Sequence, residues 1–148
     1  MKGRKDLLAY CGIYCGDCLG YTSVIADAGE NLKTVIDKYK FEQTAKCIFP
    51  TELKEYDKFY EMLEFITKLR CSGKCRTEKD TESCKIRSCC REKGFYACYQ
   101  CNGFEVCDKL KSSMKGLHTD SCIENLKAIK EMGIETWLNS GKRKMYWM

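Results

Sequence analysis

Eight of the thirteen cysteines of this 148-residue chain fall between Cys71 and Cys107. Three others belong to the motif CGIYCGDC near the start of the chain, at Cys11, Cys15 and Cys18. Thiols separated by two to four residues can converge on one metal ion, because short turns bring their sulfur atoms together. The cysteine pattern therefore predicts metal binding, and it constrains the fold more than any other feature.

The cellular compartment decides whether these thiols bind metal or form disulfides, since disulfides need an oxidising environment. The apolar run after the charged residues 1–6 covers only residues 7–10, which is too short for the core of a signal peptide, of about 7 to 15 residues. No stretch approaches the ~20 apolar residues of a membrane span. The cysteine count is also odd, so full pairing would leave one thiol over. We expect reduced thiols in a cytoplasmic protein that does not associate with membranes.

The net charge of +5 could indicate nucleic-acid binding. Residues 68–93 carry nine basic and four acidic side chains, so this cysteine-rich block accounts for the whole excess. A divalent ion held by four thiolates has a net charge of −2, and basic neighbours such as Arg76 and Arg91 can donate hydrogen bonds to the sulfur atoms. The excess is then balanced internally. Nucleic-acid binding through the basic tail 142–144 is therefore a weaker alternative.

Helical periodicity flanks the cysteine-rich block. Apolar residues recur at a helical period over 21–40, with an interruption at Gly29, again over 51–70, and in a last helix over 119–133. Residues 71–102 have little periodicity and too few apolar side chains to fold unaided, so bound metal must supply the missing free energy. We predict a mainly α fold with an irregular, metal-stapled cysteine-rich lobe that contains zinc-knuckle-like segments. A small α+β fold is the alternative.

The length of the chain fits one domain. We expect a single domain over residues 1–148, in which a metal lobe at 71–107 packs with helices from 20–70 and 104–139. Within the last of these ranges, a helix predicted over 104–115 would carry a cysteine in its first turn.

Zinc is the first candidate metal, because structural zinc sites take four ligands in a tetrahedron, delivered as pairs from turns. Enough pairs are present for one complete site and nearly two, and the N-terminal triplet must borrow a fourth ligand from elsewhere. We therefore expect two or three zinc ions, with a pairing that spacing alone does not decide. The central candidates are Cys71 with Cys75, Cys84 with Cys89 or Cys90, Cys98 with Cys101, and then Cys107.

An iron-sulfur cluster is the alternative, because thiolate ligation alone does not choose between zinc and iron-sulfur. Cys11, Cys15 and Cys18 have the spacing of radical enzymes that cleave S-adenosylmethionine. The strand-helix alternation of those enzymes does not follow, and Asp17 stands where they usually have an aromatic residue. A simpler cluster would make the chain an electron carrier or a redox sensor.

The roles of three other thiols and of the only histidine are open. His118 lies four residues before Cys122, so on one helix the two would share a face and could complete a zinc site. We favour a plainer interpretation, in which His118 is exposed to solvent and Cys122 is a small buried apolar residue. Cys47 is expected to be a core or free thiol. One of Cys89 and Cys90 is expected to be a spare, because adjacent cysteines rarely bind the same ion.

Catalytic motifs are missing from the sequence, which contains no P-loop, no dinucleotide fingerprint and no HExxH. A Cys–His dyad would have to use His118, and nothing in the sequence places it near an activated cysteine. The pattern therefore favours a binding or scaffolding module over an enzyme, with a protein partner whose identity the sequence does not indicate.

The order of its motifs resembles that of a small cysteine-rich family of bacteria and archaea, a domain of unknown function often noted as zinc-binding. The resemblance rests on CGIYCGDC, CSGKCR, CKIRSCC, CYQCNGFEVCDKL and the late stretch ENLKAIKEMGIETWL. It implies bound zinc and supplies no activity. The ligand positions that it implies are Cys11, Cys15, Cys18, Cys71, Cys75, Cys84, Cys89, Cys98, Cys101 and Cys107.

Overall fold

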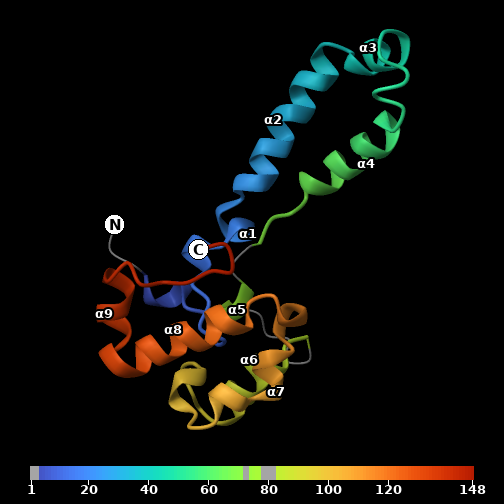
Figure 1. The fold of residues 1–148 in the computed structure, drawn as a ribbon. Coiled ribbons are helices and arrows are strands. Elements are labelled where there is room, and N and C mark those ends of the chain that lie inside the picture. Colours follow the sequence, from blue (N-terminus) through green and yellow to red (C-terminus); the bar gives the residue numbers. More distant parts are fainter. Residues whose placement is uncertain (1–3, 72–73, 78–82) are drawn as a thin grey trace. The chain divides into compact units, whose positions relative to one another are not determined.

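The structure is a computed structural model that describes residues 4–71, 74–77 and 83–148. This part of the chain is mainly helical, as predicted, and contains one isolated antiparallel bridge and no strand, which gives the α+β alternative no support (Figure 1). None of its helices is long and apolar enough to cross a membrane. The chain divides into two compact units: the first joins Met1–Cys18 to Gly73–Met148, and the second is Leu19–Ser72.

The predicted metal lobe is shared between these units, since Cys71 belongs to the second and the later cysteines to the first. Residues 72–73 and 78–82 of that lobe lie outside the described residues. The remainder is more helical than the irregular segment expected, because residues 85–92 form a regular helix.

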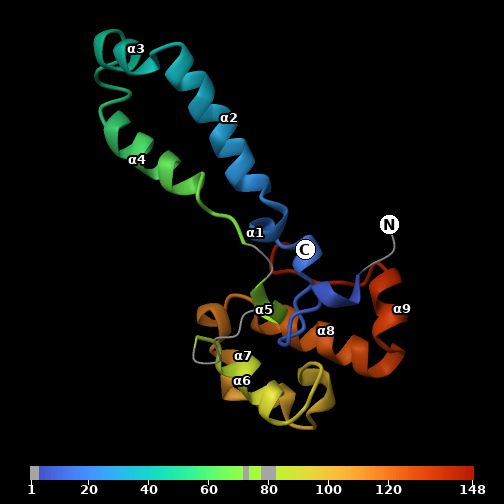
Figure 2. The same cartoon turned by 180° about the vertical axis from the view of Figure 1, so that it is seen from behind.

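The second unit is a helical hairpin whose two long arms, α2 and α4, run antiparallel (Figures 1 and 2). The period over 21–40, interrupted at Gly29, indicated one kinked helix or two short ones. The chain forms two helices there, but they divide at Ser23, which has a φ of 60°, and α2 runs through Gly29. A Cβ atom on Gly29 would lie 2.8 Å from Cγ2 of Ile66, so the glycine permits the close approach of α4. The elements are α1 (Leu19–Thr22), α2 (Val24–Lys38), α3 (Phe41–Cys47) and α4 (Tyr56–Ile66).

The turn before α4 explains why this helix begins later than predicted. Residues 50–55 form turns, and the amide of Tyr56 donates a hydrogen bond to the carbonyl of Leu53 (3.0 Å). Leu53 thereby packs on the hairpin core. This core is small, and its buried members are Ile36, Ala45, Tyr56 and Leu63.

The first unit is built from turns, short helices and one longer helix, α8. The helix predicted over 104–115 is wrong, because Cys107 has extended backbone angles (φ −71°, ψ 116°) and divides that stretch into shorter elements. The elements are η1 (Lys5–Leu7), η2 (Cys15–Asp17), α5 (Lys74–Thr77), α6 (Lys85–Glu92), η3 (Cys98–Gln100), η4 (Phe104–Val106), α7 (Asp108–Lys111), η5 (Ser113–Gly116), α8 (Thr119–Met132) and α9 (Ile134–Asn139).

Helix α8 is the predicted last helix, and it supplies one side of both apolar clusters of this unit. Cys122 and Leu126 lie in the cluster that also contains the cysteine-rich turns, whereas Ile129 packs in a second cluster with Trp137. The ring of Tyr14 meets that of Trp137 edge to face, with the ring centres 6.3 Å apart. The N-terminal segment is therefore packed against the C-terminal helices.

Gly12 lets the CGIYC turn lie directly against α8. Its φ is +94°, a conformation that residues with a side chain rarely adopt. A Cβ atom there would lie 2.7 Å from Cγ of Leu126 and 3.0 Å from the carbonyl oxygen of Cys122.

The left-handed conformation alone costs a residue with a side chain about 1–2 kcal/mol. The substitution Gly12→Ala is expected to lower the free energy of unfolding by more than this, because the added Cβ atom also clashes with α8. Gly94→Ala is the matched control, since Gly94 also has a positive φ (65°) but no atom within 4 Å of an added Cβ. Urea unfolding followed by circular dichroism measures both. Equal losses for the two variants would contradict the close approach at Gly12.

Candidate metal centre

Nine of the ten predicted ligands belong to the first unit, and Cys71 is exposed in the second. All thirteen cysteines are among the described residues, and none of them forms a disulfide. Eight of these nine cysteines pack against an apolar core that includes Tyr10, Phe104 and Leu126. They are Cys11, Cys15, Cys18, Cys75, Cys84, Cys98, Cys101 and Cys107.

The two C-x-x-C motifs of this unit form the same turn. The amide of Cys18 donates to the carbonyl of Cys15 (3.0 Å), and that of Cys101 donates to the carbonyl of Cys98 (2.9 Å). In each, the first cysteine begins a 3-10 turn and the second follows it with extended angles. Such turns present two sulfur atoms from one short loop, as the predicted zinc-knuckle-like segments require.

Five cysteines line one cavity of about 300 Å³: Cys89, Cys90, Cys98, Cys101 and Cys107. Cys90 is buried, and its Sγ atom lies 3.5 Å from that of Cys98. The hydrogen bond between these thiols lowers the pKa of Cys90 and raises that of Cys98. Both Cys89 and Cys90 line the cavity. Which of the two is the spare therefore stays a prediction.

A second pair of thiols joins the N-terminal turn to α8. A hydrogen bond from Cys122 lowers the pKa of Cys11 to about 7, and the same bond raises that of Cys122. Burial raises the pKa of Cys75, although the amide of Tyr10 donates a hydrogen bond to its sulfur. Cys75 also interacts electrostatically with Cys11 and Cys84. These thiols therefore lie close enough to influence one another's charge.

The Arg76 side chain is the cation that these thiols share. Its guanidinium lies between the rings of Tyr10 and Tyr96, 4.1 and 4.0 Å from their centres, and donates hydrogen bonds to the carbonyls of Leu8 (2.8 Å) and Tyr96 (2.6 Å). Its charge lowers the pKa values of Cys11, Cys75 and Cys90. Its buried Nη2 atom has no hydrogen-bond partner among the described residues. One donor thus stays free beside the thiols.

The thiols are gathered but do not form a finished ligand set. Within residues 4–71, 74–77 and 83–148, no group of three or more His, Cys, Asp and Glu side chains is arranged to hold a metal ion. The predicted ligand groups and their pairing therefore stay predictions.

His118 is buried, so the prediction that it is exposed to solvent is wrong. Only 7% of its surface is exposed, because the C-terminal tail folds over it and places the rings of Tyr146 and Trp147 edge to face at 4.9 and 6.0 Å. Burial lowers its pKa. Cys122 is buried among apolar residues as expected, and Cys47 is an exposed free thiol at the end of α3.

The basic tail gives little support to nucleic-acid binding. Arg143 pairs with Asp17 (2.6 Å) and lies over the ring of Tyr14, 4.8 Å from its centre. The backbone of Lys144 exchanges two hydrogen bonds with the buried amide of Asn125 (2.8 and 2.9 Å). This part of the tail is therefore anchored to the first unit.

Sequence reasoning missed the contact of Cys122 with Cys11 and the central position of Arg76. A signal for the first was present, since Cys122 continues the apolar stripe of α8, which the N-terminal turn covers. Nothing in the sequence separates Arg76 from the other basic residues of its block, because its role depends on tyrosines 66 residues before it and 20 residues after it.

Replacing Arg76 by Lys is expected to lower the free energy of unfolding by about 2 to 3 kcal/mol, because lysine keeps the charge but loses the planar stacking and one of the two carbonyl bonds. Arg70→Lys is the control, because Arg70 bridges two exposed carboxylates, an arrangement worth less than about 1 kcal/mol. Urea titration of both variants measures the difference. A loss for Arg76→Lys no larger than that of the control would contradict the role of Arg76.

A family model described as "Protein of unknown function (DUF3795)" matches residues 7–112. This stretch includes the four cysteine motifs on which the resemblance rests and ends before the late motif ENLKAIKEMGIETWL. No curated protein and no solved structure matches the chain.

Proposed function

The chain belongs to the DUF3795 family of proteins of unknown function, and we propose that it is a small zinc-binding protein whose metal is mainly structural. The observation that carries this proposal is the cavity lined by five cysteines in the first unit. Thiolates from short turns are the usual ligands of structural zinc, which when bound supplies folding free energy. The proposal requires reduced thiols and therefore a reducing compartment such as the cytoplasm.

The distance between two thiols supports the fit of this cavity to zinc. Four sulfur atoms bound to zinc at about 2.3 Å in a tetrahedron lie about 3.8 Å from one another. The 3.5 Å between the sulfur atoms of Cys90 and Cys98 is close to this sulfur–sulfur distance. Cys101 and Cys107 face the same cavity, and Cys89 competes with Cys90 for the remaining place.

A second zinc ion is proposed for the thiols near the N-terminal turn. Cys11, Cys75 and Cys84 interact electrostatically, and the buried Nη2 atom of Arg76 is available to a thiolate beside them. Cys122 is a further donor through its hydrogen bond to Cys11. Cys15 and Cys18, on one turn, supply the remaining pair of this region.

A structural role fits the surroundings of the thiols better than an open catalytic site does. They pack against Tyr10, Phe95 and Phe104 within one apolar cluster, and a closed ligand set in a core is typical of structural zinc. The function proposed for the whole chain is accordingly that of a binding or scaffolding module with a protein partner.

An iron-sulfur cluster is the second candidate, and the number of thiols favours it. The cavity is lined by five thiols, one more than the four ligands of a tetrahedral zinc ion. Thiolate ligands suit a cluster as well as zinc. In that case the chain would carry electrons or sense redox state.

Metal analysis of untagged protein purified without oxygen distinguishes these candidates. We expect two or three zinc ions per chain and no visible absorption band. Iron with acid-labile sulfide and a broad visible band would instead show that the thiols hold an iron-sulfur cluster. Protein that folds without either would overturn both.

Cys98→Ser is expected to release one zinc ion and to lower the melting temperature, because it removes a ligand from the cavity. Cys47→Ser is the control and should change neither quantity, since Cys47 is exposed in the other unit. Comparing Cys90→Ser with Cys89→Ser then shows which neighbour binds, and the distance to Cys98 favours Cys90. Full metal content in Cys98→Ser would contradict the assignment.

A further inference from the structure

The second unit leaves an apolar stripe on α2 uncovered. Its members are spaced alternately three and four residues apart, which keeps them on one side of the helix in the pattern of a helix-helix seam. All five are exposed, and Val35 and Tyr39 leave 53% and 68% of their surface open. The stripe consists of Ile25, Ala28, Leu32, Val35 and Tyr39.

Helix α4 carries a second stripe with the same spacing, formed by Phe59, Met62 and Ile66. Met62 leaves 60% of its surface open, and Phe59 leaves 38%. Tyr56 and Leu63 are the side chains of α4 that fill the hairpin core. Ile66 lies against Gly29 of α2, whereas Phe59 and Met62 are additional to the side chains that hold α2 and α4 together.

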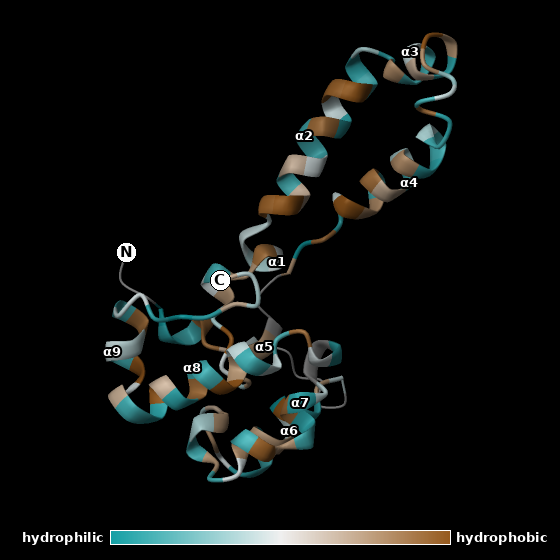
Figure 3. Cartoon of the chain, in the orientation of Figure 1, coloured by the Kyte–Doolittle hydropathy of each residue, from teal (hydrophilic) through white to brown (hydrophobic). Residues whose placement is uncertain are grey.

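The two stripes lie on the same side of the hairpin, because residues of both line one groove of about 620 Å³. Leu32, Val35 and Tyr39 come from the α2 stripe and Phe59 from the α4 stripe, and Phe41 also lines the groove. Figure 3 shows hydrophobic residues along both arms. The groove is thus an apolar surface made by two neighbouring helices.

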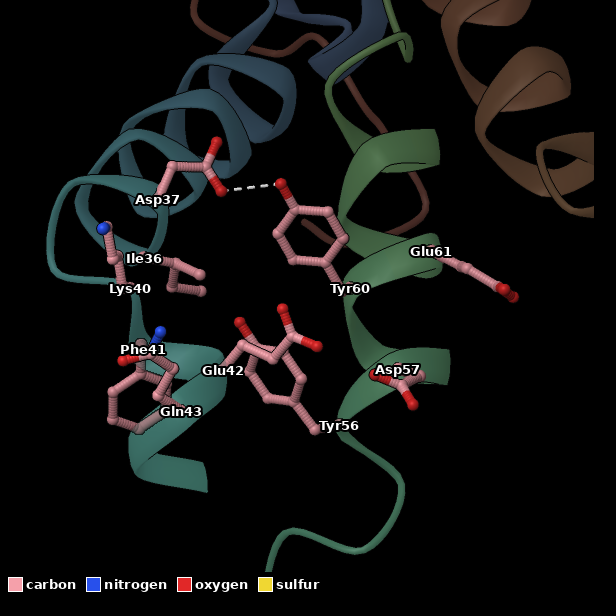
Figure 4. Close-up of a pocket in the computed structure, with 10 residues that line it drawn as sticks. All are labelled: Ile36, Asp37, Lys40, Phe41, Glu42, Gln43, Tyr56, Asp57, Tyr60 and Glu61. Carbon is pink, nitrogen blue, oxygen red and sulfur yellow. Dashed lines mark hydrogen bonds between the residues drawn. The ribbon is translucent and has the colours of Figure 1, made fainter. Parts of the chain in front are cut away.

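The other flank of the hairpin carries charged side chains, among them Asp37, Glu42 and Asp57, which Figure 4 shows around Ile36 and Phe41. There Tyr60 donates a hydrogen bond to Asp37 (2.6 Å). Lys46 forms ion pairs with Glu42 (2.7 Å) and Asp57 (2.9 Å). One flank of the hairpin thus carries hydrogen-bonded and charged side chains, whereas the other exposes apolar ones. This contrast indicates that a binding partner covers the apolar flank.

We propose that this apolar flank binds the same flank of a second copy of the chain, so that two hairpins form an antiparallel four-helix bundle. Two adjacent helices, each with an apolar stripe whose residues are spaced alternately three and four apart, form half of such a bundle. A twofold dimer places this apolar flank against the same flank of the partner, which buries apolar surface on both. Residues 19–72 carry eight basic and nine acidic side chains, so two copies do not repel each other through net charge.

The exposed area is sufficient for a stable dimer. Seven large apolar side chains of this flank leave about a third to two thirds of their surface open, on the order of 100 Å² each. Together they expose on the order of 700 Å², which exceeds the largest patch of many monomers and approaches the ~800 Å² that each partner contributes to a standard interface. They are Ile25, Leu32, Val35, Tyr39, Phe41, Phe59 and Met62.

Sedimentation velocity of the full chain between about 1 and 100 μM, where interfaces of this size can associate, tests the proposal. We expect a dimer, and we expect Val35→Glu to raise its dissociation constant at least about a hundredfold, because the dimer would bury a charge. Ile48→Glu is the matched control, since Ile48 is exposed in the same unit but does not line the groove. A monomer at 100 μM, or a dimer unchanged by Val35→Glu, would overturn the proposal.

Hydroxyl-radical footprinting of the unaltered chain gives a test that needs no variant. Oxidation of Tyr39 and Met62 should fall as the protein concentration rises, because the dimer covers them. Met148, which leaves 64% of its surface open in the other unit, is the internal control. If the oxidation of Met62 relative to that of Met148 stays the same at every concentration, the flank is not an interface between copies.

Discussion

The position of Arg76 determines how the first unit is assembled. Its guanidinium lies between the rings of Tyr10 and Tyr96 and donates to the carbonyls of Leu8 and Tyr96. Leu8 and Tyr10 belong to the N-terminal turn, whereas Tyr96 belongs to the cysteine-rich segment. One side chain thus holds together the two stretches that carry the thiols, and its charge stabilises their thiolate forms.

Spacing predicted much of this unit, because it is a local property. The two C-x-x-C motifs form the turns expected of them, and α8 follows its apolar period. Spacing could not predict which thiols face each other. The place of Cys90 beside Cys98 depends on the orientation of α6, a short helix whose cysteines and charges conceal its period, and the burial of His118 depends on a tail that returns from the end of the chain.

The two units obtain their stability in different ways. The first packs eight predicted ligands around one apolar cluster, so metal and core would stabilise it together. The core of the second has only four buried members, and a larger set of apolar side chains is exposed. The periodicity of 21–40 and 51–70 did not reveal this, because a helical period does not say how many faces of a helix will be covered. The structural metal is therefore proposed for the first unit and the dimer interface for the second. The two proposals rest on independent observations.

Hydrogen-deuterium exchange, recorded before and after a strong chelator removes the metal, tests the central claim most directly. If metal holds the first unit together, amides of 4–18 and 83–148 lose their protection on chelation, whereas those of α2 and α4 keep theirs. Unchanged protection of the first unit after complete removal of the metal would contradict the claim that the thiols bind a structural metal.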